Sequence, residues 1–451
     1  MALGKRQPQQ GELFLATTDL PPAPGHPFYT QLNALLAEGA FDPFVEELCA
    51  AHYDTEGHGR PSIPPGVYFR MLFVGYFEGL DSQRGIAWRC ADSRSLQAFL
   101  GYLPTQATPD HSSLSRIRQR LPEVVHENVF AFVLHLAEAK GLGLLAGKTV
   151  AIDATLLEAN AAMKSIRRRD TNDDWKAYVT KLAAEAGLTD PTDAELRRFD
   201  KQRKDKKVSN DDWQSPSDPD SRIAKMKDGT THLAYKAEHV VDLDSNLVLS
   251  AEIHPADQAD SATLPPSLTS AQLNLLRAGN DTEIEAIVAD KGYHKLTLLA
   301  DCAAADIRTY IPEPEQAHDH VWTDKPAEQQ RAYRNNRRRL QGARSKRLQR
   351  RRSEYVERTF AHVCETGRGR RSWLRGLPAV SKRYLMQVAA HNLGVIMRRL
   401  FQMGTPRGLQ GRCALVCVAI RLPIATFSSC LRPAASTYSI DVTGRRYALA
   451  H

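Results

Sequence analysis

The stretch Thr149-Val150-Ala151-Ile152-Asp153 is typical of a buried β-strand that ends on a single carboxylate. Val150 and Ile152 are β-branched, as a buried strand prefers. Before this stretch, residues 31–143 carry apolar side chains at helical spacing, which predicts a compact all-helical unit. After it, strand and helix patterns follow one another to residue 402, so we expect an α/β domain over residues 148–402.

Within this domain the pattern predicts a mixed sheet with covering helices. Residues 242–246 are a hairpin-like turn between two strands, which adds an antiparallel portion to the sheet. The expected strands are 149–153, 231–242, 246–254, 284–289 and 307–311, and the expected helices are 262–278, 295–304 and 384–401. The fold class is therefore α/β, or mixed α+β, preceded by helices.

Three further regions stand apart by composition. Residues 1–30 are rich in Pro, Gln and Gly, so we expect them to lack a fixed structure. Residues 165–228 are polar and heavily charged, and we interpret them as an insertion into the α/β domain. No element is predicted for the C-terminal tail, residues 403–451.

The overall composition is that of an ordinary water-soluble protein. Of 451 residues 42% are apolar and 25% are charged, and the net charge of +8 suits a polyanionic partner. The seven cysteines form no CxxC pair, which fits a reducing cytosol and argues against a disulfide scaffold or a zinc site. The N-terminus has no apolar signal-peptide core, and the longest apolar run, residues 413–424, is too short to span a bilayer. We expect a cytoplasmic protein without a membrane segment.

Three carboxylates stand in positions that could bring them together. Asp153 and Asp290 each end a predicted strand, and ligands of open α/β sheets collect outside such strand ends. Glu357 lies at the edge of a helical apolar stripe, which could aim it along the same ends. Converging carboxylates repel one another unless cations neutralise them, and Mg²⁺ prefers oxygen ligands. Two such ions could cut a phosphodiester.

Other interpretations of these acids stay open. Aspartates at strand ends are common turn residues, and Glu357 could simply be a solvated helical side chain. Asp257 and Asp260 follow the strand 246–254, so they could replace or support Asp290, although we favour a loop. Glu158 and Asn160 could support Asp153 or merely begin a helix.

A basic run precedes Glu357. Residues 331–352 contain eleven Lys and Arg and no acid, and arginine matches phosphate bidentately. The alternative is a solvated helical face. Including cations near Asp290 and Glu357, the expected DNA contacts are Lys291, Tyr293, Arg337, Arg338, Arg339, Lys346, Arg347, Arg350, Arg351, Arg352, Arg358 and Arg368.

Several motifs, in order along the chain, carry a family resemblance. The segments beginning at Val150 and Val288, and the block from Val356 through residues 375–377 and 391–393, resemble the three acidic segments of D-D-E insertion-sequence transposases. Residues 76–80, 99–102 and 109–114 resemble the InsH-like N-terminal transposase domain. The resemblance covers roughly residues 60–400.

This resemblance implies an RNase H-like catalytic domain and an enzyme that cuts and joins DNA. Asp153, Asp290 and Glu357 would be the catalytic triad and hold Mg²⁺ or Mn²⁺, as two ions. The partners would be the terminal inverted repeats and target DNA, bound by a homodimer in a synaptic complex associated with the nucleoid. A DNA-binding relative without catalysis, or a metal-dependent nuclease of another role, remains the alternative.

The chain departs from the family pattern around Glu357. Many relatives carry a Lys or Arg seven residues after the glutamate, where this chain has Cys364. The arginine expected four residues before it is also displaced, because Ser353 stands there and Arg352 one residue earlier. The sequence therefore leaves open which cation accompanies Glu357.

Overall fold

The structure is a computed structural model that describes residues 25–53, 62–203, 209–315, 322 and 324–409. The described residues up to Pro406 belong to one compact unit. A second unit begins at Arg407, and its described part is the 3₁₀ turn η5 (Arg407–Leu409). Most of the segment 1–30 and of the tail 403–451, for which the sequence predicted no regular element, lies outside the described residues. Residues 27–30 correct the expectation for the first segment, because they begin a helix and bury Phe28 and Tyr29.

The helical unit contains seven helices among the described residues: α1 (Pro27–Glu38), α2 (Phe41–Ala50), α3 (Pro65–Phe77), α4 (Gln83–Asp92), α5 (Arg94–Phe99), α6 (His111–Arg120) and α7 (Glu123–Ala139). Ser82 and Ser93 accept hydrogen bonds from the first turns of α4 and α5, and Asp110 caps α6 in the same way. The chain turns between α1 and α2 at Ala40, which has a left-handed φ of 55°.

The sheet has six strands: β1 (Thr149–Glu158), β4 (Arg222–Lys225), β5 (Thr231–Asp242), β6 (Val248–Pro255), β7 (Ala286–Val288) and β8 (Arg308–Tyr310). The long strand β5 pairs antiparallel with β1 along one edge, and with β4 and β6 along the other. On its other side β1 pairs with β7, and β7 with β8, both in parallel. Four strands joined by antiparallel pairing (β4, β5, β6 and β1) and two added in parallel (β7 and β8) confirm the mixed sheet that the sequence predicted for an RNase H-like domain.

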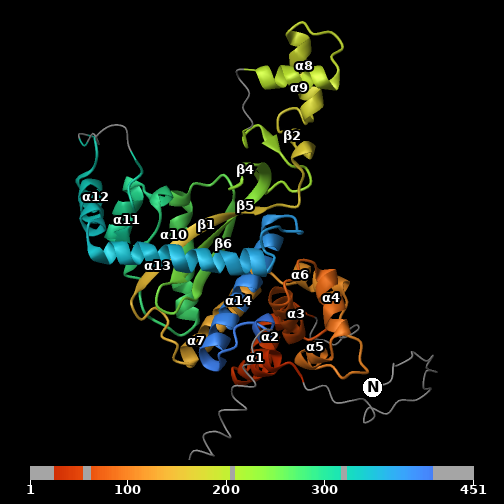
Figure 1. Ribbon diagram of the computed structural model, residues 1–451, viewed down its shortest axis with the longest axis vertical. Coiled ribbons are helices and arrows are strands. Elements are labelled where there is room, and N and C mark those ends of the chain that lie inside the picture. Colours follow the sequence, from red (N-terminus) through yellow and green to blue (C-terminus); the bar gives the residue numbers. More distant parts are fainter. Residues whose placement is uncertain (1–24, 54–61, 204–208, 316–321, 323, 410–451) are drawn as a thin grey trace, which may run out of the picture. The chain divides into compact units, whose positions relative to one another are not determined.

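Helices cover the sheet. They are α10 (Asp260–Arg277), α11 (Leu296–Ala304), α12 (Ala327–Leu340), α13 (Ala343–Phe360) and α14 (Leu377–Phe401), with the π-helical turn η4 (Ala361–Thr366) after α13. In Figure 1, α13 runs across the strands, and it contacts β1, β5 and β7. The apolar stripe Val356, Phe360 and Val363 is buried, as the sequence predicted. None of the helices described is long and apolar enough to cross a membrane.

The charged segment after β1 folds largely by itself. It contains η2 (Met163–Ser165), β2 (Arg167–Arg168), α8 (Trp175–Glu185), α9 (Asp193–Gln202) and β3 (Trp213–Gln214). α8 and α9 enclose a small core of Val179, Ala183 and Leu196. The segment connects β1 to β5, and its last strand, β4, extends the main sheet rather than the insertion.

α14 joins the helical unit to the sheet, since it packs against α3, α7 and β6. The Tyr76 hydroxyl on α3 lies 3.1 Å from His391 Nδ1 on α14. The next residue, Asn392, is fully buried and completes the edge of β6. Its Oδ1 accepts from Val248 N at 3.0 Å, and its Nδ2 donates to Val248 O at 2.8 Å.

We expect Asn392→Leu to lower the free energy of unfolding by about 2–4 kcal/mol, because two buried backbone groups of Val248 lose their partner. Urea denaturation followed by circular dichroism measures the loss. The matched control is Asn128→Leu on α7, whose side chain bonds only an exposed carbonyl of its own helix. Equal stability losses in the two variants would contradict this role of Asn392.

Candidate active site

Asp153 does not end its strand, which corrects the expectation from the sequence. β1 continues to Glu158, because β5 supplies hydrogen-bonding partners along its whole length. The pairing with β7 is much shorter and stops at Ala151 and Val288. Beyond that point one edge of β1 is free of β7. The last pair of this parallel ladder is Ala151 with Val288. Asp153 comes two residues after Ala151, and Asp290 comes two residues after Val288. The register therefore places the two aspartates side by side.

Asp290 is held by the turn that it begins. It caps the 3₁₀ turn η3 (Lys291–Tyr293), where its Oδ1 accepts from Gly292 N at 2.9 Å. The charge of Asp290 acts on its neighbour. Burial raises the pKa of the Asp153 carboxyl and Asp290 adds to this rise, whereas Arg352 and the backbone N–H of Ala154 oppose it. The two predicted aspartates therefore do meet in one electrostatic environment.

Arg352 provides the cation for this pair. Its Nη1 lies 2.6 Å from Asp153 Oδ2, and the side chains of Arg352 and Asp153 are 13% and 24% exposed. Gln349, one turn earlier on α13, accepts from Arg352 Nε at 3.1 Å. The Gln349 amide also donates to the carbonyls of Ala289 and Tyr310, at the ends of β7 and β8. α13 is thus fixed to the sheet beside both aspartates, and Arg352 neutralises Asp153 rather than facing solvent.

Glu357 lies on the same helix, five residues after Arg352, which is about 7.5 Å along the axis. Its side chain is exposed, and its Oε1 accepts from Ser353 at 3.4 Å. Within the described part of the chain, no group of three or more His, Cys, Asp or Glu is placed to hold a metal ion. The structure therefore brings Asp153 and Asp290 together without Glu357. The oxygen donors of this pair are of the kind that Mg²⁺ and Mn²⁺ bind.

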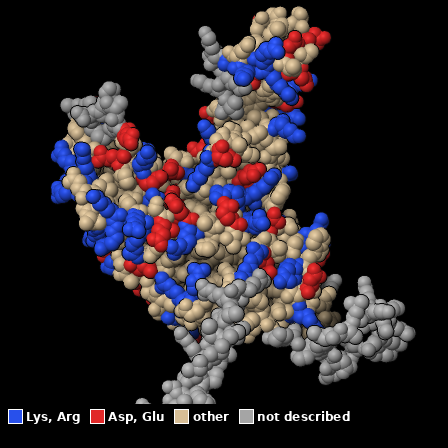
Figure 2. Space-filling view, in the orientation of Figure 1, with Lys and Arg blue, Asp and Glu red and all other residues tan. Residues whose placement is uncertain are grey.

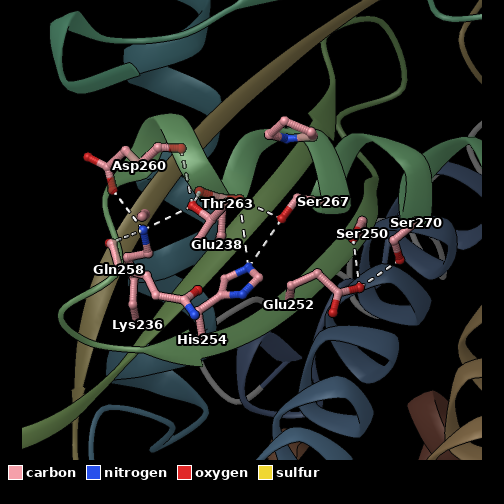
Figure 3. A network of polar contacts seen from close by, with 12 residues as sticks. Lys236, Glu238, Ser250, Glu252, His254, Gln258, Asp260, Thr263, Ser267 and Ser270 are labelled. Carbon is pink, nitrogen blue, oxygen red and sulfur yellow. Dashed lines mark hydrogen bonds and ion pairs between the residues drawn. The ribbon is translucent and has the colours of Figure 1, made fainter. Parts of the chain in front are cut away.

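Two charged residues that the sequence analysis did not single out support the Asp290 turn from the other face of the sheet. Lys236 and Glu238 are two residues apart on β5, so both side chains lie on the face of the sheet that α10 covers (Figure 3). The Lys236 ammonium donates to Gln258 O, Asp260 Oδ1 and Thr263 Oγ1. Glu238 is completely buried and accepts from three hydroxyls, those of Thr263, Ser267 and Tyr293.

Tyr293 links this network to the active site. It is 1% exposed, and its hydroxyl donates to Glu238 Oε1 at 2.7 Å. Burial raises the pKa of the Tyr293 phenol, and the charges of Glu238, Asp260 and Asp153 raise it further. The Tyr293 hydroxyl therefore faces the protein interior and holds the Asp290 turn in place, and its expected contact with DNA stays a prediction.

The two rival aspartates differ in their positions. Asp257 pairs with Arg222 at 3.4 Å, away from the turn. Asp260 is the first residue of α10 rather than part of a loop, and it pairs with Lys236 at 3.0 Å. A Cβ added to Gly292 would lie 2.7 Å from Asp260 Oδ2 and 3.1 Å from Asp290 Oδ1, so these two oxygens are within about 6 Å of each other. Gly292 is what allows Asp260 to approach Asp290.

The predicted DNA contacts fall into two classes. Besides Tyr293 and Arg352, two make internal contacts: Arg339 donates to Thr309, and Arg351 donates to the carbonyl of Leu243. The others are exposed, with at most a surface ion pair, and they are Lys291, Arg337, Arg338, Lys346, Arg347, Arg350, Arg358 and Arg368. The basic run is thus only partly available to a ligand.

The position seven residues after Glu357 cannot supply a cation. Cys364 is buried in η4, 4.0 Å from the Tyr384 hydroxyl. Arg370, which the sequence analysis did not single out, lies beside β1 instead. Its Nη1 donates to Thr155 Oγ1 at 3.1 Å, and Thr155 lies on the same face of β1 as Asp153. The fold therefore places the guanidinium of Arg370 near Asp153, although no cation stands seven residues after Glu357 on the helix.

Glu158 and Asn160 lie at the far end of this strand. Glu158 ends β1 and lies 3.4 Å from Arg371, and Asn160 donates to the carbonyl of Trp373 at 2.9 Å. The alternative in which they begin a helix is therefore wrong. Neither residue contacts Asp153, so they tie the segment after η4 to the end of the strand.

Comparison with known families gives two matches. Residues 17–120 match the family described as Transposase domain (DUF772), and residues 181–393 match the Transposase DDE domain. The second range includes Asp290 and Glu357 and begins after Asp153. The searches of curated proteins and of solved structures gave no match.

The buried Glu238 predicts a pH dependence of stability. Burial raises the pKa of its carboxyl, although the three hydroxyl donors oppose the rise. A pKa that is higher in the folded than in the unfolded chain gives stability that is present below the unfolded value, about 4.3, and is lost as the pH rises through the folded value. We therefore expect the melting temperature of the wild type, relative to Glu238→Gln, to rise as the pH falls from 7 toward 5. Parallel curves for the two proteins would contradict the assignment, and Glu354→Gln on the surface of α13 is the control.

Proposed function

The chain belongs to the D-D-E insertion-sequence transposases, and on that premise we propose that it binds the terminal inverted repeats of its element and catalyses both cleavage and strand transfer. The observation that most supports this proposal is the Asp153–Asp290 pair at the free edge of β1. Two carboxylates side by side on a sheet edge are an arrangement suited to phosphodiester chemistry with divalent ions. Transposase DDE domains generally use such ions.

We propose that Asp153, Asp290 and Glu357 hold Mg²⁺ or Mn²⁺, as two ions. Bound there, the ions would activate a water or a 3′-hydroxyl and stabilise the leaving oxygen. In the structure Arg352 neutralises Asp153, and Glu357 lies apart on the same helix. Loading the site requires Arg352 to release Asp153 and Glu357 to approach. Both changes belong to α13, so one small shift of this helix serves both.

The protein's own side chains keep the remaining geometry fixed during this change. Tyr293 and Glu238 hold the Asp290 turn from the α10 side, and no residue of α13 takes part in that contact. Arg370 stays near Asp153 through Thr155. We propose that Arg370 supplies the cation that the family pattern places after the glutamate, and that it faces a phosphate close to the reacting bond.

The exposed cations of α12 and α13 are the proposed DNA track. Figure 2 shows Lys and Arg gathered over these two helices. Lys346 and Arg350 are exposed and stand four residues apart, and the same line continues to Ser353 and Glu357. A DNA backbone that follows this line reaches Glu357. We further propose a homodimer, in which one copy binds each end of the element.

The first prediction concerns catalysis. Asp153→Asn, Asp290→Asn and Glu357→Gln each lower end cleavage by at least about a thousandfold, because each removes a ligand charge needed in the transition state. A plasmid carrying the element ends, incubated with Mg²⁺, measures cleavage and joining separately. Glu354→Gln is the matched control, since Glu354 is exposed one turn earlier on α13 and pairs with Arg358, and it retains activity.

Three other results would point elsewhere. Full activity in any of the three site variants would remove that residue from the site. Cleavage without joining would favour a nuclease. Binding of the ends without cleavage would favour a relative that has lost catalysis.

The second prediction concerns DNA affinity. Replacing Lys346 and Arg350 together by glutamine lowers the salt dependence of binding by about two phosphate contacts, a slope change of about 1.8 in log Kd against log salt. Fluorescence anisotropy with end DNA over a salt series measures the slope. Lys176→Gln on α8, an exposed lysine paired with Asp193, is the control and leaves the slope unchanged. An unchanged slope in the double variant would remove α13 from the DNA track.

A further inference from the structure

A cavity between the helical unit and α14 is lined by Arg383, a half-buried residue that forms no ion pair with any residue the structure describes. The cavity has a volume of about 210 Å³ and lies between α3, α4, α6 and α14. The Nη2 atom of Arg383 is buried and has no hydrogen-bond partner in the described structure. Burial lowers the pKa of the Arg383 guanidinium to about 10, although the charge of Asp81 opposes this. A charge that has lost its water and gained no partner is costly, so this site favours an anion.

The other groups around the cavity define the anion. Arg118 on α6 also lines it, and burial lowers the pKa of that guanidinium as well. Lys382 donates to the carbonyls of Arg118 and Leu121. Burial lowers the pKa of its ammonium, and the charge of Glu123, which does not line the cavity, opposes this. Two guanidinium groups therefore face one carboxylate, that of Asp81. Forked guanidinium groups match phosphate oxygens, whereas the rest of the wall is apolar, with Leu72, Ile86 and Met386 among its residues.

The position of the cavity indicates where such a phosphate comes from. Trp373 lines the cavity and is 45% exposed, its indole N–H donates to Asp81 Oδ2 at 3.1 Å, and Arg371 lies 4.5 Å from its ring. The carbonyl of Trp373 accepts from Asn160, just after β1. From Asp153 to the end of β1 at Glu158 is about 17 Å along the strand. A single strand that leaves the active site along β1 would meet an exposed aromatic ring and then the cavity.

We propose that this cavity binds a phosphomonoester, the 5′-phosphate at the end of a DNA strand, with the phosphate on Arg383 and Arg118 and the sugar against the apolar wall. The enclosure decides between the two kinds of DNA phosphate. A cavity of about 210 Å³ can take a strand end but not the backbone of an intact duplex, and the Arg383 guanidinium must turn toward the cavity, since its Nη2 has no exposed surface. The choice of DNA as the source rests on the proposed function; the phosphomonoester chemistry would also fit a free nucleotide.

The test compares two labelled single strands of one sequence, with and without a 5′-phosphate, by fluorescence anisotropy in EDTA on the full-length protein. The wild type binds the phosphorylated strand about tenfold more tightly. Arg383→Gln and Arg118→Gln each remove most of this difference, whereas Lys346→Gln weakens both strands equally. Thymidine 5′-monophosphate and inorganic phosphate are competitors: competition by the nucleotide and not by phosphate alone shows that the sugar contributes.

Equal affinity of the wild type for the two strands overturns the inference, and so does an unchanged preference in both arginine variants. Because the variants lie on different helices, a folding defect in one, seen as a lowered melting temperature, leaves the other to decide. Competition by thymidine monophosphate that is as strong as that by the unlabelled phosphorylated strand assigns the cavity to a free nucleotide and overturns the DNA source. End cleavage is measured separately, so this inference can fail while the proposed function stands.

Discussion

Two carboxylates placed side by side repel each other, and this repulsion organises the site. Asp153 and Asp290 are brought together because the parallel ladder between β1 and β7 stops two residues before each of them. Burial strengthens the repulsion and raises the pKa of the Asp153 carboxyl. The structure offsets it with the Arg352 guanidinium at 2.6 Å. Arg352 lies on the same helix as Glu357. If the proposed function holds, metal binding at Asp153 and Asp290 would therefore be coupled to a movement of α13.

The Asp290 turn is fixed from the α10 face of the sheet, which gives that movement a rigid reference. The contact between Gln349 and the carbonyl of Ala289 belongs to α13 itself. From the α10 face, Tyr293 reaches the buried Glu238, and Asp260 packs against Gly292. Lys236 neutralises Asp260 with an ammonium whose three donors are all used. Buried charges this well satisfied specify one arrangement, so Asp290 stays in place when Arg352 and Glu357 move.

Local patterns predicted a large part of this. The bounds of β5 and the buried stripe beside Glu357 follow from alternation and helical spacing. The sequence missed what depends on distant partners. Lys236 and Glu238 look like solvent-facing residues of a strand, and only α10 buries them. Arg352 looks like one more DNA-binding arginine, yet its partner is 199 positions away. Tyr293 looks exposed beside a catalytic turn, but its hydroxyl turns inward.

The central claim is that Asp153 and Asp290 share divalent metal with Glu357 once Arg352 has withdrawn. A crystal structure of the protein with Mn²⁺ and end DNA, with the metal located by anomalous scattering, tests it most directly. The account predicts Mn²⁺ in contact with all three carboxylates and Arg352 no longer within hydrogen-bond distance of Asp153. Mn²⁺ bound through Asp260 in place of Glu357, or an intact Arg352–Asp153 pair beside bound metal, would contradict it.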